Sequence, residues 1–319
     1  MCMDRIIPEL KGQEKNTLYV IGNGFDMYHG LKTSYHDFHD WLKSNHYSEF
    51  ILDLEKMFPT LSNNEPLLWK DFEAAIGNFD LLSIHKEFFQ GKDDGFYDED
   101  VSKMVVNRIS PTINDIPKLL RNWLKDIDVF EVKNRLKLSW DSLFLSFNYT
   151  MILENVYSIP KNRVLHIHNS LGGNEKLITG HNSEVSSYEA EKLCFGANEE
   201  QSVQLIAQEM TNLIKPVDQQ MKQHMHFFNS LQNISNVVVF GHSLSMIDRP
   251  YLTHIQRNIQ DFAHWYFICK DDGSITNCKK YVKLFNNRRT YRVIGVDIEE
   301  EGLCKKMLPE NCKYFKKND

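Results

Sequence analysis

The sequence predicts an α/β protein built on a Rossmann-like, mostly parallel sheet that is flanked by helices. Short apolar runs recur along the chain, helical segments separate most of them, and the first run leads directly into a cluster of glycines. Uninterrupted apolar runs suit strands buried on both faces of a parallel sheet, and their alternation with helices is typical of βαβ units. We see no convincing strand in 46–138, so we expect a helical insertion after the first βα unit.

The individual elements follow from the same pattern. The expected strands are the apolar runs over 17–21, 142–147, 163–168, 176–180, 236–241, 264–269 and 291–296. Helices are expected over 34–43, where Thr33 or Ser34 suits the N-cap, and over 150–157, 199–232, 248–260, 276–286 and 300–308. We therefore assign 1–45 and 139–319 to one Rossmann-like core and 46–138 to the helical insertion.

Composition and charge narrow the function classes. The 319 residues are 42% hydrophobic and 25% charged, which excludes a disordered or fibrous chain. The net charge of −6 is unlike that of a protein that coats nucleic acid or anionic lipid. The six cysteines form no CxxC pair, the N-terminus has no signal pattern, and the longest aliphatic stretch, near Val237–Phe240, is too short to cross a bilayer. We expect a cytoplasmic protein with reduced thiols, no membrane contact and no strong nucleic-acid signature.

A cluster of glycines follows the first expected strand. Gly22, Gly24 and Gly30 lie within nine residues of one another, and GNGFD at 22–26 directly follows the run TLYVI. Glycines at such a turn let backbone N–H groups approach a phosphate, and the next helix adds a favourable dipole. The spacing fits neither GxGxxG nor the P-loop pattern, so a nucleotide site and a plain tight turn both stay open. Asn23 and Asp26 suit a ribose, or ordering of the loop, better than a phosphate.

Polar residues also follow two later strands, at the sheet edge where parallel strands place ligands. Asn148 and Thr150 follow the strand 142–147, although both also suit capping of the next helix. His166 and His168 lie on the strand 163–168, and its period of two should place both imidazoles on the same side. They could serve as a base, as metal ligands or as packing residues, and the metal signal is weak without a nearby carboxylate or cysteine.

A further polar segment follows the strand 236–241. Gly241, His242 and Ser243 suit a pocket for an adenosine or a pyrophosphate. The string GHSLS is not a nucleophile elbow, because Ser245 stands where the second glycine of GxSxG must allow a sharp turn. A serine hydrolase is therefore disfavoured.

Several strings in fixed order resemble the AbiH family of bacteriophage abortive infection proteins. They are IGNGFDMYHGLKTSYHDF, WKDFE, FLSFNYTMILENVY, HIHNS, LITGHN and VFGHSLSMIDRPYL, and together they span roughly residues 17–260. Asn169 stands where the family usually has a glycine after the histidine, which leaves the backbone conformation of the loop after His168 open.

The same order is more distantly similar to the sirtuin (SIR2) superfamily, whose members bind NAD on a Rossmann-like sheet. This resemblance implies catalytic roles for Asn148 and His168, which are 20 residues apart. It implies that the nucleotide is bound by Gly22, Asn23, Gly24, Phe25, Asp26, Ser34, Thr150, Gly241, His242 and Ser243. Thr150 stands where sirtuins have an aspartate, and the four-cysteine zinc module is absent, so NAD cleavage is implied and protein deacetylation is not.

The resemblance therefore implies an antiphage defence protein that cleaves NAD at the nicotinamide glycosidic bond, which makes it a hydrolase with no metal expected. The alternative is a non-catalytic, nucleotide-sensing module that acts through a protein partner. Nucleic-acid cleavage is disfavoured, because the sequence has no compact carboxylate cluster for a two-metal site. NAD is expected as substrate or ligand, and a phage-derived or host protein trigger and a homo-oligomer stay open.

Overall fold

The chain divides into two compact units. The computed structural model describes residues 7, 10–58, 67–89, 103–129, 131–182, 197–285, 290–299 and 302–305. The sheet unit comprises Met1–Thr33, Leu124–Glu175 and Pro216–Asp319, and the helical unit comprises Ser34–Trp123 and Lys176–Lys215. These boundaries differ from those predicted, because 34–45 and 176–215 belong to the helical unit and 124–138 belongs to the sheet unit.

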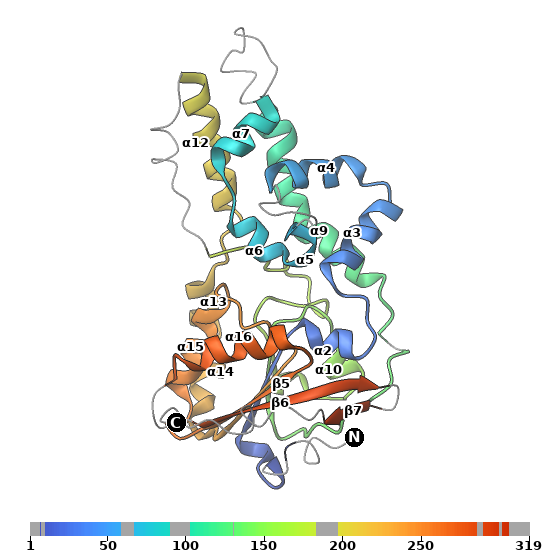
Figure 1. The fold of residues 1–319 in the computed structure, drawn as a ribbon, viewed down its shortest axis with the longest axis vertical. Coiled ribbons are helices and arrows are strands. Elements are labelled where there is room, and N and C mark those ends of the chain that lie inside the picture. Colours follow the sequence, from blue (N-terminus) through green and yellow to red (C-terminus); the bar gives the residue numbers. More distant parts are fainter. Residues whose placement is uncertain are drawn as a thin grey trace. The chain divides into compact units, whose positions relative to one another are not determined.

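The sheet unit is built on a Rossmann-like sheet, as the sequence predicts (Figure 1). Its strands are β1 (Thr17–Ile21), β2 (Leu143–Ser146), β3 (Val164–His166), β4 (Asn236–Phe240), β5 (His264–Cys269), β6 (Thr290–Glu299) and β7 (Gly302–Lys305). They lie in the order β3-β2-β1-β4-β5-β6-β7; the first six are parallel, and β7 pairs antiparallel with β6. This is the doubly wound order 3-2-1-4-5-6 with an added edge strand, so the topological switch point lies at β1, between β2 and β4.

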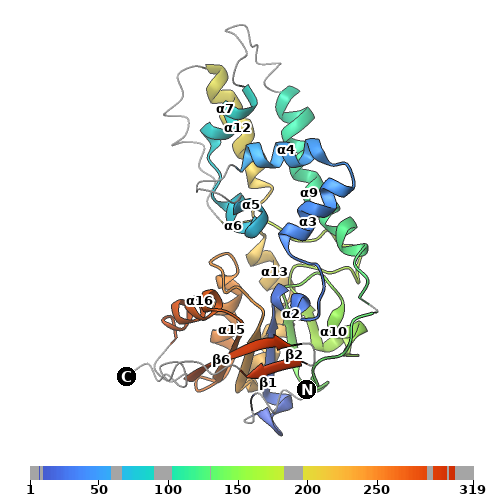
Figure 2. The same ribbon diagram turned by 45° about the vertical axis from the view of Figure 1, so that its right-hand side comes forward.

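Helices cover both faces of this sheet. Those of the sheet unit are α2 (Asn23–Tyr28), α10 (Ile152–Asn155), α13 (Val217–Gln223), α14 (Met225–Asn229), α15 (Arg249–Asn258) and α16 (Asp272–Val282), with short 3-10 turns η2 (Glu14–Asn16), η4 (Lys161–Arg163) and η5 (Ser230–Asn233). Leu18 and Val20 of β1 face a core that includes α15 and α16, whereas Tyr19 and Ile21 face a core that includes α2 and α10. Figure 2 shows α16 and α10 on opposite sides of the strands. Burial on both faces explains why β1 and β4 have no polar interruption.

The helical unit contains no strand among its described residues. Its elements are α3 (Tyr35–Ser44), α4 (Ser48–Met57), α5 (Leu67–Lys70), α6 (Phe72–Gly77), α7 (Leu81–Phe89), the π-helical η3 (Val105–Ile109), α9 (Ser110–Lys125, which ends in the sheet unit) and α12 (Ala197–Thr211). The predicted helix over 34–43 is confirmed as α3, and Ser34 and Asp37 form a capping box at its start. Lys215 is buried and lies 2.7 Å from the carboxylate of Glu73, between its Nζ and Oε1.

Three predicted elements differ from the structure. The run 176–180 is not a strand; His181 beside it makes only an isolated bridge to Ile214, within the helical unit. The expected helix over 199–232 is broken into α12, α13, α14 and η5, with Pro216 as the N-cap of α13. The expected helix over 300–308 is wrong where the structure describes it, because 302–305 pairs with the end of β6 as β7.

Candidate functional site

The glycines after β1 and β4 bring two backbone segments into contact at the switch point. The Gly22 N–H donates to Phe240 O at 3.0 Å, and the Gly24 N–H donates to Gly241 O at 2.9 Å. A Cβ on Gly22 would lie 2.5 Å from the Cα of His242, and Gly241 has a φ of +69°. Only glycine permits this approach without displacing the backbone.

The segment GNGFD is therefore not an open loop. Gly22 is the N-cap of α2, and the helix begins at Asn23. The amides of Gly22, Gly24 and Phe25 all donate to carbonyls within the sheet unit. In this conformation these three amides are not available to a phosphate, and the glycines serve the contact between the two segments.

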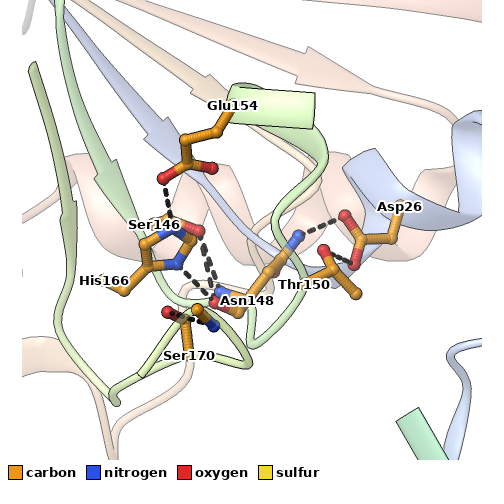
Figure 3. Close-up of polar contacts among 8 residues, drawn as sticks. Asp26, Ser146, Asn148, Thr150, Glu154, His166 and Ser170 are labelled. Atoms are coloured by element: carbon orange, nitrogen blue, oxygen red, sulfur yellow. Dashed lines mark hydrogen bonds and ion pairs between the residues drawn. The ribbon is translucent and has the colours of Figure 1, made fainter. Parts of the chain in front are cut away.

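Asn148 lies just beyond β2 in a buried hydrogen-bond network with α2 (Figure 3). Its Nδ2 donates to Asp26 Oδ1 at 2.8 Å and to Gly22 O at 3.1 Å. Because both partners are acceptors, the orientation of the amide is fixed with its nitrogen toward α2. The remaining atom, Asn148 Oδ1, is buried and has no hydrogen-bond partner among the residues that the structure describes. The site therefore presents one oriented, unsatisfied acceptor.

Asp26 anchors this network from the first turns of α2. Its carboxylate also accepts a hydrogen bond from Thr150 Oγ1 at 2.7 Å, and the residue is 1% exposed. Burial raises the pKa of Asp26 to about 6, against the opposing effect of the Thr150 and Asn148 hydrogen bonds. Thr150, predicted as a binding residue, thus acts here on Asp26.

His166 closes the other end of the network. Its Nδ1 lies 2.9 Å from Asn148 O and its Nε2 lies 3.0 Å from Glu154 Oε1 (Figure 3). Since a carbonyl oxygen only accepts, Nδ1 carries a hydrogen, and Nε2 of a neutral ring would then face a carboxylate as acceptor to acceptor. His166 therefore links the backbone of Asn148 to the side chain of Glu154. Both residues are committed to holding the backbone after β2.

His166 contacts Glu154 of α10, on the side of one core, whereas His168 lies against Phe147 and Tyr251 of the other core, so the prediction that both imidazoles face the same side is wrong. The strand β3 ends at His166, and a turn follows in which the Asn169 N–H donates to His166 O at 3.2 Å. Asn169 has a φ of 62°, a left-handed conformation that glycine favours and asparagine tolerates. The turn rotates His168 toward the ring of Phe147, whose centroid is 5.4 Å away.

A second set of side chains meets at His168. Asp248, which directly precedes α15, has its Oδ1 3.6 Å from His168 Nε2 and its Oδ2 3.5 Å from His242 Nε2. All three side chains are at least nine-tenths buried. His242, predicted for nucleotide binding, thus shares a carboxylate with the predicted catalytic His168. Asp248 is not among the predicted site residues, because an aspartate at the start of a helix carries no signal that distinguishes a site from a cap.

The remaining predicted residues have other surroundings. Asn23 Nδ2 donates to Thr33 O at 2.7 Å, and the Phe25 ring packs in the core at 5.2 Å from Phe240. Ser34 belongs to the helical unit, where it caps α3. Ser243 O accepts a hydrogen bond from Asn277 Nδ2 at 3.2 Å. The nucleotide-binding roles of Asn23 and Ser243 stay predictions.

The described residues contain no group of three or more His, Cys, Asp or Glu side chains placed to hold a metal ion. None of the helices over the same residues is both long enough and apolar enough to span a membrane.

The sheet and this site define a Rossmann-like α/β protein whose buried polar residues gather at the carboxyl ends of β1 to β4. The family model described as Bacteriophage abortive infection AbiH matches residues 18–269. The chain therefore belongs to the AbiH family, which confirms the resemblance found in its motifs. No curated protein and no solved structure gives a significant match. The more distant similarity to sirtuins stays a prediction.

Proposed function

We propose that this AbiH protein acts in abortive infection by hydrolysing NAD at the nicotinamide glycosidic bond. The observation that supports this best is the buried, unsatisfied acceptor Asn148 Oδ1, beyond the end of β2, with His168 just after the neighbouring strand β3. Ligands of doubly wound sheets bind outside these strand ends, near the switch point.

Asn148 supplies orientation in this proposal. Asp26 and Gly22 hold its amide nitrogen, so its oxygen is the atom that meets the ligand. An acceptor selects a donor, which here is a ribose hydroxyl or the attacking water. A fixed acceptor costs little reorganisation when the substrate binds, and positioning of this kind lowers the barrier of a reaction between two molecules.

His168 supplies the proton acceptor. The bond between C1′ of the ribose and the nicotinamide nitrogen breaks, nicotinamide leaves with the bonding electrons, and an oxocarbenium-like ribose develops. Water adds at C1′ and His168 accepts its proton, which yields nicotinamide and ADP-ribose. An imidazole is suited to this step, because its ordinary pKa lies near neutral pH.

The pyrophosphate of NAD is not bound by the glycine N–H groups that follow β1, although the sequence suggests them for this role. The amides of Gly22 and Gly24 donate within the protein, so they do not contribute to a phosphate site in this conformation. We therefore assign the ribose next to nicotinamide to the Asn148 end of the site, and the pyrophosphate to groups other than these amides.

The test compares the wild type with Asn148→Ala and His168→Ala in cells challenged with a panel of phages, while cellular NAD is measured. We expect the wild type to protect and to deplete NAD, and both variants to do neither. Asn162→Ala is the matched control, because Asn162 is exposed and lies at the opposite end of β3, ahead of the strand. It should behave as the wild type. Intact NAD in protected wild-type cells would overturn the proposal.

The same experiment identifies the alternative function. In a nucleotide-sensing module, protection would survive His168→Ala, and the purified protein would retain an uncleaved nucleotide. Mass spectrometry of material that co-purifies with the wild type and with His168→Ala distinguishes the two functions.

A further inference from the structure

Asp248 lies between two imidazoles that are not equivalent. Its carboxylate oxygens are 3.6 Å from His168 Nε2 and 3.5 Å from His242 Nε2. These separations exceed those of ordinary hydrogen bonds, so the contacts are mainly electrostatic. Burial strengthens them, because charges interact more strongly away from water.

The tautomer of His242 is fixed by the backbone. The Leu244 N–H donates to His242 Nδ1 at 2.9 Å, so this nitrogen is an acceptor and carries no hydrogen. In the neutral ring the hydrogen is then on Nε2, which faces Asp248. His242 cannot take up a second proton without losing the Leu244 hydrogen bond, and its Nε2 cannot bind a metal ion while it carries that hydrogen.

Aromatic rings restrict both imidazoles. The Phe147 ring centroid lies 4.3 Å from that of His242 and 5.4 Å from that of His168. The ring of Tyr251, on the first turn of α15, packs against those of His168 and Phe147, with centroid distances of 5.8 and 5.9 Å. The rings therefore cannot reorient freely, which preserves the alignment of both Nε2 atoms with Asp248.

The Asp248 side chain faces the two imidazoles and does not cap α15. An aspartate at an N-cap ordinarily accepts from the first backbone N–H groups of the helix. The Asp248 side chain makes no such cap bond, and its oxygens face the two imidazoles. The helix α15 begins with Arg249 and has a proline in its first turn, which reduces the number of amides that need a cap.

We infer that Asp248 is a positioning residue that, with His242 fixed as a neutral donor, directs proton uptake to His168 alone. This rests on the proposed NAD hydrolysis for its catalytic meaning. The carboxylate compensates the charge that His168 gains when it accepts the proton from water, and its second oxygen faces His242 Nε2 at 3.5 Å. Neither Asp248 nor His242 exchanges a proton in the reaction.

The first experiment does not depend on NAD hydrolysis. Nitrogen-15 NMR of histidine-labelled protein reports which ring nitrogen carries hydrogen, with assignment by single His→Gln variants. We expect the neutral His242 ring to carry its hydrogen on Nε2 and none on Nδ1, because the Leu244 N–H donates to Nδ1. Asp248→Asn, which keeps the shape of the side chain, should lower the midpoint of the His168 titration by about one pH unit or more. His254, on the same helix, is the internal control and should not shift.

The second experiment measures catalysis by the same variants. Asp248→Asn should lower kcat for nicotinamide release by about 10²-fold with little change in KM. His242→Gln can still accept from Leu244 and donate toward Asp248, so it should retain more activity than His242→Ala. Equal loss in these two variants would show that His242 exchanges a proton and would overturn the inference.

The two experiments separate the possible failures. A wild type that binds NAD without cleaving it contradicts the proposed function, and the NMR result still decides the roles of Asp248 and His242. An Nδ1–H tautomer of His242, or a His168 titration that is the same in Asp248→Asn, overturns the inference even if NAD is hydrolysed.

Discussion

Replacing Asp26 by asparagine should stabilise the protein at neutral pH. The Asp26 side chain is buried, and burial raises its pKa from 3.8 to about 6. The folded state therefore binds this proton more tightly than the unfolded state, and ionised Asp26 costs stability. A shift of roughly two pK units corresponds to about 3 kcal/mol. The free energy of unfolding of the wild type should fall by this amount as the pH rises from 3.8 through about 6.

The network can accept the amide without rearranging. In Asp26→Asn the new amide oxygen can accept from Asn148 Nδ2, as Asp26 Oδ1 does. The new NH2 group can donate to Thr150 Oγ1, because a hydroxyl that now donates to the carboxylate can instead accept. The substitution therefore removes the titrating group and keeps the hydrogen bonds.

A second buried group opposes the effect of Asp26 on the wild type. Burial lowers the pKa of His29 from 6.5 to about 4. The stability that neutral His29 contributes is therefore present above pH 6.5 and is lost as the pH falls toward 4. Asp26 and His29 change the free energy of unfolding in opposite directions as the pH rises. Only the difference in that free energy between Asp26→Asn and the wild type therefore isolates the effect of Asp26.

Urea unfolding followed by circular dichroism at several pH values measures this difference. The free energy of unfolding of Asp26→Asn, minus that of the wild type, should rise by about 3 kcal/mol between about pH 4 and pH 7 and then level off. Asp271→Asn is the control of opposite sign, because the Ser274 N–H lowers the pKa of Asp271 and that variant should lose stability relative to the wild type as pH rises. A difference for Asp26→Asn that is constant with pH would refute the reasoning.

Two further substitutions test features of the fold by the same unfolding measurement. Gly241→Ala should lower the free energy of unfolding by about 3 kcal/mol, because a φ of +69° is strained for alanine and the new Cβ would overlap the neighbouring backbone. Gly30 has a φ of +81° with open space around it, so Gly30→Ala should lower it by only about 1 kcal/mol. Equal losses of stability would contradict the close approach of the backbone at Gly241. Glu73→Gln removes the carboxylate that lies 2.7 Å from the buried ammonium of Lys215, and it should lower the free energy of unfolding by about 3 kcal/mol. Lys70→Gln, at the exposed end of α5, should leave that free energy unchanged. An unchanged stability in Glu73→Gln would contradict a buried ion pair.

The sequence predicts the sheet well because its strands are buried on both faces. β1 and β4 are uninterrupted apolar runs after their first residues, Thr17 and Asn236, and every position in both strands is buried. The run 176–180 is apolar too, yet Leu177 is buried in the helical unit, and the Gly180 backbone there contacts Leu213 O. Periodicity cannot show whether a short apolar run meets a neighbouring strand or another buried surface.

The candidate site is predictable only in part. Parallel strands bring their carboxyl ends to one edge, so Asn148 and His168 could be selected from their positions. The side on which His168 lies depends on where β3 ends, and no residue marks that end before Asn169. Asp248 stands at the start of a helix, where capping explains it equally well. These features depend on contacts between distant segments, which a single sequence does not specify.

The contact between Gly22 and His242 couples the positions of the two polar clusters, one around Asn148 and the other around Asp248. Gly22 O accepts a hydrogen bond from the Asn148 amide, and a Cβ on Gly22 would lie 2.5 Å from the Cα of His242. The side chain of His242 in turn faces Asp248. A shift at either cluster must therefore move the other, because no side chain between them can yield. Under the proposed function, the spacing between the two clusters would be set before NAD binds, and a molecule that needs a wider spacing would be excluded.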